Sequence, residues 1–451
     1  MAKNTDIRIL EVHCSFEPYK FRTPLSFGGR VQQGSELINV EIKVESRNGK
    51  HAIGFGSMPM GNVWAWPSET VTPDQTAAAI KQFARELIEI AEDFPEFAHP
   101  LETMYRISGE YTHLGQKISR QMKLAEPMPP LAELVAASPF DAALHDAFGR
   151  AHSQNSYNLL GKEFVATDLS EYLDASFKGE YLDKYTLREP KPRMPLYHLV
   201  GALDPLSMED VTTKVGDRLP ECLADWIAAE GLTHLKIKLG SGDLQADLDR
   251  TLAVDKVATE AQAKRNVSNW FYSLDFNEKC PDVGFLLEFL KKLKAASPAA
   301  YERIQYIEQP THRDLKGHPD QKVHEAAQLK PVVIDESLAD YETLLLAREM
   351  GYSGVALKAC KGHSDALLIA AAAQKMGLFL CVQDLTCPGF SFLHSASLAA
   401  RIPTVTAIEG NARQYSPSMN RQWRTRFPGM FDIKDGTVNT SLLNGVGLGF
   451  D

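Results

Sequence analysis

The clearest pattern in the chain is the strict alternation at 235–239, where three apolar residues are separated by Lys236 and Lys238. Successive side chains of a strand point to opposite faces, so this pattern predicts a strand with both lysines on one face. An ordinary half-exposed strand, with its lysines in water, would show the same alternation. The later strands of the chain help to decide between a functional role for the two lysines and ordinary exposure to water.

Four later apolar runs each end in a charged residue. They are 270–274 before Asp275, 304–307 before Glu308, 331–334 before Asp335 and 354–357 before Lys358. Further apolar runs lie near residues 197, 381 and 407, and helix-like segments separate the runs. Repeated alternation of strand and helix favours parallel strands, and eight of them predict a barrel that carries its chemistry at the carboxyl ends.

The N-terminal part has another pattern, first β and then α. Alternation at 7–16 and 37–45 predicts strands, and Asn48-Gly49 predicts a hairpin turn to a paired strand at 51–57. Two segments that contain Gly, Pro or Met, 23–30 and 56–61, are expected to be loops. Each segment is expected to be either a plain surface loop or a loop that covers a ligand.

Helical spacing predicts helices at 75–92 and from Ser138 to Arg150. The segment 94–130 is expected to be an irregular helical insertion, and 161–193 a polar connecting insertion with little periodicity.

Composition narrows the class of protein. A chain of 451 residues suits a barrel with a smaller second domain. The net charge is −10 and no large basic block is present, which argues against a nucleic-acid partner. No apolar run is long enough to cross a membrane, so no membrane partner is expected.

The cysteines and the N-terminus indicate the compartment. Residues 1–6 open no signal-peptide pattern, and the 6 cysteines form no Cys-x-x-Cys pair. We therefore expect free thiols in a reducing cytoplasm and no zinc or redox site.

The acids at the strand ends suggest a metal site. Adjacent parallel strands are about 4.8 Å apart, so Asp275, Glu308 and Asp335 can converge on one point. Three uncompensated carboxylates would repel each other and raise their pKa values, and a hard divalent cation removes that penalty. All-oxygen ligands favour Mg²⁺, with Mn²⁺ next. The alternative is a set of salt bridges between these acids and the lysines.

Lys238 and Lys358 are expected on strands that flank the acidic strands on opposite sides. A lysine in a partly desolvated cavity, near a cation and other lysines, has its pKa lowered and can act as a base. Two such lysines could remove a proton from one face of a substrate and return it on the other. Lys236 is expected to tune Lys238 or to contact the substrate, and Lys361 to lie behind the site or on the surface.

The ordered set Lys236-x-Lys238, Asp275-Phe276-Asn277, Ile307-Glu308-Gln309-Pro310, Asp335-Glu336-Ser337 and Leu357-Lys358 resembles the enolase superfamily. Within it, the motifs resemble the muconate lactonizing enzyme subgroup rather than the mandelate racemase subgroup. The resemblance implies an N-terminal α+β capping domain over 1–150, a modified TIM barrel, (β/α)₇β, over 151–413, and a segment at 414–451 that returns to the cap.

The same resemblance implies roles for the site residues. Asp275, Glu308 and Asp335 would be Mg²⁺ ligands, and Lys238 and Lys358 the acid/base pair. The implied reaction is abstraction of the proton α to a substrate carboxylate, with Mg²⁺ and lysine stabilising the enediolate. A small-molecule carboxylate substrate and a homo-oligomeric assembly are expected.

Two departures from the family bear on the substrate. No histidine ends the seventh strand, where Gln383 and Asp384 stand, and neither His363 nor His394 falls at that position. A His-based dehydratase is therefore disfavoured. The eighth strand ends in Glu409-Gly410-Asn411 without the Asp-x-Asp pair of dipeptide epimerases, which argues against a dipeptide substrate.

Three functions remain open from the sequence. The first is a racemase or epimerase of a carboxylic acid or amino-acid derivative that uses two lysine bases. The second is a lyase or cycloisomerase on the same scaffold, with one lysine as base and the other as an electrostatic partner. The third is a non-catalytic, metal-binding barrel. The cap segments and the ends of strands seven and eight would choose the substrate.

Overall fold

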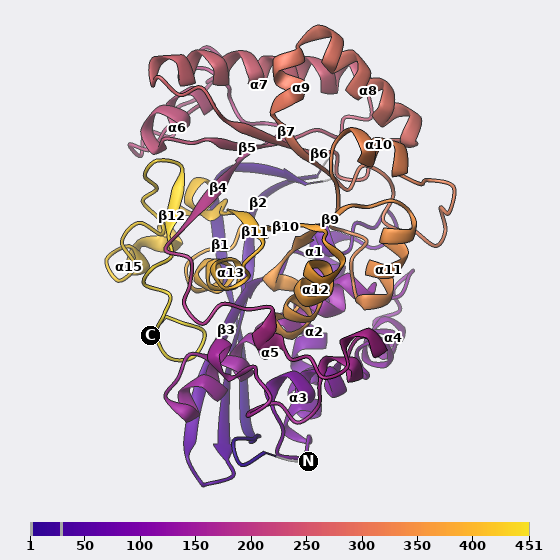
Figure 1. The fold of residues 1–451 in the computed structure, drawn as a ribbon, viewed down its shortest axis with the longest axis vertical. Coiled ribbons are helices and arrows are strands. Elements are labelled where there is room, and N and C mark those ends of the chain that lie inside the picture. Colours follow the sequence, from indigo (N-terminus) through magenta and orange to yellow (C-terminus); the bar gives the residue numbers. More distant parts are fainter. Residues whose placement is uncertain (1–2, 28–29, 451) are drawn as a thin grey trace.

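The computed structural model of this chain describes residues 3–27 and 30–450, and an antiparallel sheet opens the fold (Figure 1). Its strands are β1 (Ile7–Phe27), β2 (Arg30–Ser46) and β3 (His51–Pro59), in that order. The predicted hairpin turn joins β2 to β3, and Gly49 has the positive φ of 75° that such a turn requires.

The two expected loops are mainly strand, so that prediction was wrong. Leu25 pairs with Gln32 at the far end of β1 and β2, and residues 28–29 lie outside the described residues. Gly56 belongs to β3, where a Cβ would lie 2.0 Å from the Pro139 carbonyl oxygen. The glycine therefore allows a close approach of helix and sheet rather than an irregular loop.

Five helices follow the sheet: α1 (Asn62–Ala65), α2 (Pro73–Glu92), α3 (Pro100–Ser108), α4 (Tyr111–Gln121) and α5 (Pro130–His152). A capping box of Thr72 and Gln75 starts α2 where the sequence predicts it. The segment expected to be irregular holds α3 and α4. Helix α5 begins before Ser138, because Pro139 is accommodated inside it.

The predicted barrel is confirmed. Its strands are β4 (Arg193–Val200), β5 (His234–Lys238), β6 (Phe271–Asp275), β7 (Ile304–Glu308), β8 (Val332–Ile334), β9 (Gly354–Leu357), β10 (Phe379–Val382) and β11 (Val405–Glu409). Neighbouring strands pair in parallel, and pairing of Ile408 with Leu196 joins β11 to β4 and closes the barrel. Buried side chains fill its interior, among them Tyr197, Tyr306 and Cys381.

Helices follow the strands and cover the barrel. They are α6 (Leu223–Glu230), α7 (Leu244–Lys264), α8 (Val283–Ala296), α9 (Pro298–Arg303), α10 (His324–Leu329), α11 (Tyr341–Glu349), α12 (His363–Met376) and α13 (Phe390–Arg401). Figure 1 shows α7, α8 and α9 along the end of the molecule farthest from the N-terminal sheet. Helix α13 was missed by the sequence pattern because it is buried along its whole length and so lacks a polar face.

Short helical turns occupy the connecting segments. They are η1 (Ser156–Leu159), η2 (Leu169–Glu171), η3 (Ala175–Phe177), η4 (Leu182–Lys184), η5 (Ala359–Lys361) and η6 (Pro417–Asn420). Three of them lie in the predicted polar insertion at 161–193.

The C-terminal segment contacts both parts of the molecule. It contains α14 (Ala412–Tyr415), α15 (Arg421–Arg424) and β12 (Thr437–Asn439), and β12 pairs antiparallel with β4. Further on, the Leu448 amide donates to the Asp146 carboxylate of α5 at 3.0 Å. The domain boundaries at 150 and 413 stay predictions. No helix among the described residues has the length and apolarity to span a membrane.

Candidate active site

The register of the barrel gathers the predicted residues at its carboxyl end. Lys238 pairs with Asp275, and Asp275 with Glu308, on neighbouring strands. Asp335 and Lys358 directly follow β8 and β9. Because the parallel strands end at one rim, side chains from five consecutive strands meet there. All of them are buried, from 0% exposure at Asp275 and Glu308 to 8% at Lys238.

Lys236 lies below this rim and holds three acids. Its Nζ lies 3.1 Å from Asp275, 2.9 Å from Glu308 and 3.2 Å from Glu409. Burial alone would lower the pKa of Lys236, but the surrounding carboxylates outweigh burial and raise it well above its ordinary value. The surrounding acids therefore favour the charged form of Lys236 at the base of the site.

Lys238 and Asp275 form one side of the site. The Lys238 Nζ lies 2.5 Å from an Asp275 carboxylate oxygen and donates to the Asn277 side-chain oxygen at 3.0 Å. Burial would raise the pKa of Asp275, but the Lys238 and Lys236 ammonium groups lower it below its ordinary value. Asp275 is therefore ionised.

Lys358 and Lys361 form the other side. Their ammonium groups lie 2.9 and 3.2 Å from the two carboxylate oxygens of Asp335. Lys361 is 5% exposed, so it lies behind the site and not on the surface. Despite burial, the Asp335 carboxylate raises the pKa of Lys358 above its ordinary value. The expected lowering of the lysine pKa is therefore absent, because this lysine is paired with a carboxylate.

Glu308 is the acid of the site whose charged form is least favoured. Its pKa is raised well above the ordinary value by burial and by repulsion from Asp275, which together outweigh the attraction of Lys236. The Gln383 amide also donates to Glu308. Gln383 and Glu409 end the two strands that were expected to choose the substrate. Both are buried, and both contact the charged network.

The three carboxylates have the donor chemistry for a divalent cation. All their donors are oxygen, two lie at paired register positions, and the charged form of Glu308 is disfavoured in this arrangement without a further cation. Both carboxylate oxygens of Asp335 are buried, and each contacts one lysine ammonium group. In the arrangement observed, however, no three His, Cys, Asp or Glu side chains among residues 3–27 and 30–450 are gathered as a ready metal site. Lysine ammonium groups hold the acids instead.

The N-terminal domain contributes a residue that the sequence did not single out. The Trp64 ring lies 4.4 Å from the Lys358 Nζ, and its Nε1 donates to Glu336 at 3.0 Å. Trp64 also lines a cavity of about 560 Å³ that reaches Asn277 and Arg313. The only sequence signal is its position just after the Gly- and Met-containing segment at 56–61.

Two histidines near the site in sequence lie elsewhere in space. The His363 Nδ1 is 3.0 Å from the His394 Nε2, and the His363 ring packs on His145 at 4.5 Å between centroids. These three histidines form a buried cluster between α5, α12 and α13. Asp384 is also buried and accepts backbone bonds from Thr386, Cys387 and Asn411.

Comparison with known proteins identifies the family and the fold. The family model described as Enolase C-terminal domain-like matches residues 218–451. The hydrophobic dipeptide epimerase of Enterococcus faecalis is 24% identical over 280 residues, which cover 59% of this chain and 72% of that protein.

Two solved structures share the fold. The dipeptide epimerase of Enterococcus faecalis V583, complexed with Mg and the dipeptide L-Leu-L-Tyr, has a TM-score of 0.64 at 17% identity and covers 98% of this chain and 99% of its own. The muconate lactonizing enzyme of Pseudomonas fluorescens, complexed with muconolactone, has a TM-score of 0.62 at 16% identity. The match covers 98% of this chain and 96% of that protein. The predicted resemblance is confirmed, and the chain belongs to the Enolase C-terminal domain-like family of enzymes.

Proposed function

We propose that this protein is a racemase or epimerase that removes the proton α to a substrate carboxylate and returns it to the opposite face. The observation that carries the proposal is the position of two lysines. Lys238 contacts the first acid of the series, Asp275, and Lys358 contacts the last, Asp335. A substrate bound between them would have one amino group on each side.

The proton balance follows from this placement. One lysine, as the neutral amine that becomes accessible when its carboxylate partner is engaged elsewhere, takes the α-proton, and the electron pair stays on the substrate as an enediolate. The other lysine, as the ammonium ion, gives its proton to the same carbon from the opposite side. The two lysines exchange roles when the opposite enantiomer reacts. Lys236 keeps its charge in both directions because three acids surround it.

We propose Asp275, Glu308 and Asp335 as ligands for Mg²⁺, with Mn²⁺ as a substitute. The all-oxygen donor set and the raised pKa of Glu308, which a cation would offset, support this assignment, as does the magnesium in the Enterococcus faecalis structure. A divalent cation held there would balance the acids and polarise the substrate carboxylate.

For the substrate, we propose a carboxylic acid or amino-acid derivative that lacks the free N-terminal ammonium group of a dipeptide. Glu409 is engaged by Lys236 at 3.2 Å and by the Asn411 amide at 2.6 Å. Asp384 accepts three backbone bonds. Neither acid is free to hold a substrate ammonium group, which distinguishes this site from one built for dipeptides.

The test is exchange of the α-proton with solvent. The Mg²⁺-loaded protein is incubated in D₂O with pooled carboxylic acids and N-acylamino acids, and loss of the α-proton is followed by NMR. Exchange with inversion supports the proposal and identifies the substrate class. New olefinic or lactone signals would favour the lyase or cycloisomerase instead. Bound Mg²⁺ with no exchange in any pool would favour a non-catalytic barrel.

A further inference from the structure

A second cavity lies between the N-terminal helices and the barrel helices, apart from the proposed catalytic residues. It has a volume of about 400 Å³ and is lined by residues of α3, α4 and α5 on one side and of α11 and α12 on the other. Figure 1 shows where these helices lie. None of the three proposed metal ligands or the catalytic lysines lines it. A narrower space that shares Tyr111 and Asp365 continues it inward to Asp141 and Lys361.

Acidic side chains line this cavity without a cation to balance them. Glu133, Glu342 and Asp365 belong to its wall, and the described lining contains no lysine, arginine or histidine. The decisive residue is Glu133, which is only 4% exposed. Within the described part of the chain, no hydrogen bond or ion pair engages its carboxylate, and burial raises its pKa to about 7. A carboxylate buried in this way is costly unless a partner reaches it.

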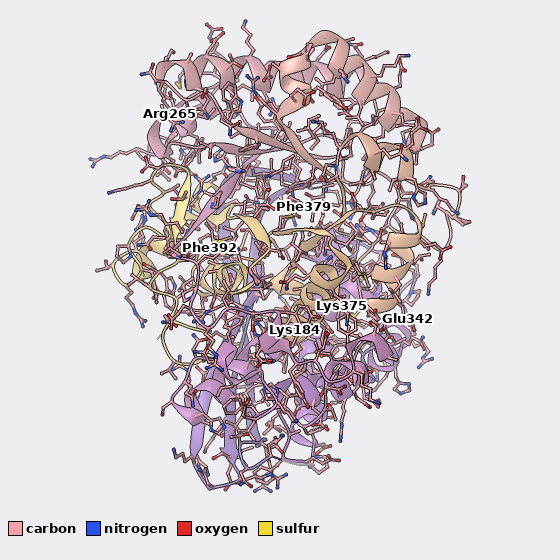
Figure 2. All side chains as sticks on the ribbon, viewed as in Figure 1. Lys184, Arg265, Glu342, Lys375, Phe379 and Phe392 are labelled. Carbon is pink, nitrogen blue, oxygen red and sulfur yellow. The ribbon has the colours of Figure 1, made fainter. Side chains whose placement is uncertain are left out.

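Three lysine side chains near the cavity form ion pairs with other acids. Lys361, at the inner end, donates to the Asp335 carbonyl and lies 3.2 Å from its carboxylate. Figure 2 labels Lys184 and Lys375 in the same region as Glu342. Both lysines donate to Glu180, at 2.7 and 3.2 Å respectively. None of these three lysines therefore supplies the missing positive charge.

The rest of the wall is aromatic and apolar. Tyr105 and Tyr172 pack edge to face, with 5.0 Å between their centroids, and Leu134 and Leu368 also line the cavity. Tyr111 is buried near Asp141, Asp365 and Glu133, which together with burial raise its pKa well above the ordinary value. Aromatic faces beside carboxylates recognise organic cations by combined charge and cation–π attraction.

We propose that this cavity is a binding site for a small organic ammonium ion, with Glu133 and Asp365 as its anionic partners. A bare divalent metal is a poorer match, because the described acids are not gathered into a metal-ligating group and half of the wall is apolar. The site is separate from the proposed catalytic function and does not depend on it.

The test uses butylammonium as the probe and butanol as its neutral analogue of equal length. Binding to the Mg²⁺-loaded full chain is measured by ligand-observed NMR at pH 8, where Glu133 is charged. We expect saturable binding of butylammonium and none of butanol. Glu133→Gln and Asp365→Asn should each weaken the binding by about tenfold or more, since each removes a charge-assisted contact.

Two further variants separate the site from general attraction to an acidic protein. In Gly115→Ala, the added Cβ would lie 2.3 Å from a Glu133 carboxylate oxygen and would displace it, so binding should weaken although α4 keeps its fold. Glu260→Gln makes the same charge change on an exposed position of α7 and should leave binding unchanged. The proposal is overturned if butylammonium does not bind the unmodified protein. It is also overturned if the three cavity variants bind butylammonium as tightly as the Glu260→Gln control does.

Discussion

Trp64 of the N-terminal domain lies over the ammonium group of Lys358 of the barrel, with 4.4 Å between Nζ and the ring centroid. The two residues are far apart in sequence, yet the same indole ring also donates to Glu336, next to Asp335. One side chain of the cap therefore holds a barrel lysine and a barrel acid in place, so the proposed catalytic site is completed only when the two parts pack together.

Removing this ring should slow the exchange reaction. A desolvated cation–π contact contributes about 1–2 kcal/mol, so Trp64→Leu should reduce the α-proton exchange rate by about 5- to 30-fold. Trp64→Phe keeps an aromatic face and should retain more activity. The rates are measured by NMR in D₂O at saturating substrate. Equal rates for Trp64→Leu and the unmodified protein would mean that the ring does not position Lys358.

Loss of Lys236 should destabilise the fold more than loss of Lys238. Lys236→Met leaves Asp275, Glu308 and Glu409 without their shared cation, and breaking a buried ion pair in this way costs about 3–5 kcal/mol. Lys238→Met removes one contact from Asp275, which still has Lys236. Urea unfolding of the metal-free variants compares the two. Equal losses would contradict the central role assigned to Lys236.

Acid should weaken the fold through the buried histidines. His394 is buried, and burial lowers its pKa to about 4 from an ordinary value of 6.5. Below pH 6.5 the unfolded chain takes up a proton that the folded protein excludes, so stability falls as the pH falls towards 4. Between pH 7 and 5 this one group should cost about 2 kcal/mol.

The pH effect is isolated by comparison with His394→Gln, measured by urea unfolding at pH 7 and pH 5. The variant lacks the titrating imidazole and should lose about 2 kcal/mol less over this range than the unmodified protein. An identical loss in both proteins would show that His394 does not exclude a proton in the folded state.

Removal of the divalent cation should abolish exchange reversibly. After treatment with a chelator, activity should disappear, and Mg²⁺ or Mn²⁺ should restore it. Glu308→Gln should bind Mg²⁺ more weakly by calorimetry, because one proposed carboxylate ligand becomes an amide. Exchange that survives complete metal removal would contradict the assignment of the three acids.

The sequence allows prediction of those parts of the site that follow from strand periodicity. Lys236, Lys238, Asp275 and Glu308 lie in or at the end of short apolar strands, and the parallel register then places their side chains together. Glu409 of β11 also contacts Lys236 and belongs to the same network. This contact does not follow from the pattern of one strand, because it depends on the position of β11 in the closed barrel.

Other parts could not be predicted because they depend on packing between distant segments. Trp64 has no periodic pattern that points to Lys358. The pairing of Lys358 with Asp335 depends on side-chain conformations, and it raises the lysine pKa where the isolated pattern suggested a lowered one. Glycine at position 56 looks like a loop signal, whereas it lets β3 approach α5.

The central claim is that Lys238 and Lys358 act on opposite faces of one carbon, and enantiomer-specific exchange tests it most directly. Each pure enantiomer of the identified substrate is incubated in D₂O with Lys238→Ala and, separately, with Lys358→Ala. The account predicts that each variant still exchanges the α-proton of one enantiomer, a different one in each case, while neither variant racemises the substrate. Loss of exchange from both enantiomers in one variant, with no effect in the other, would contradict it and assign the chemistry to a single base.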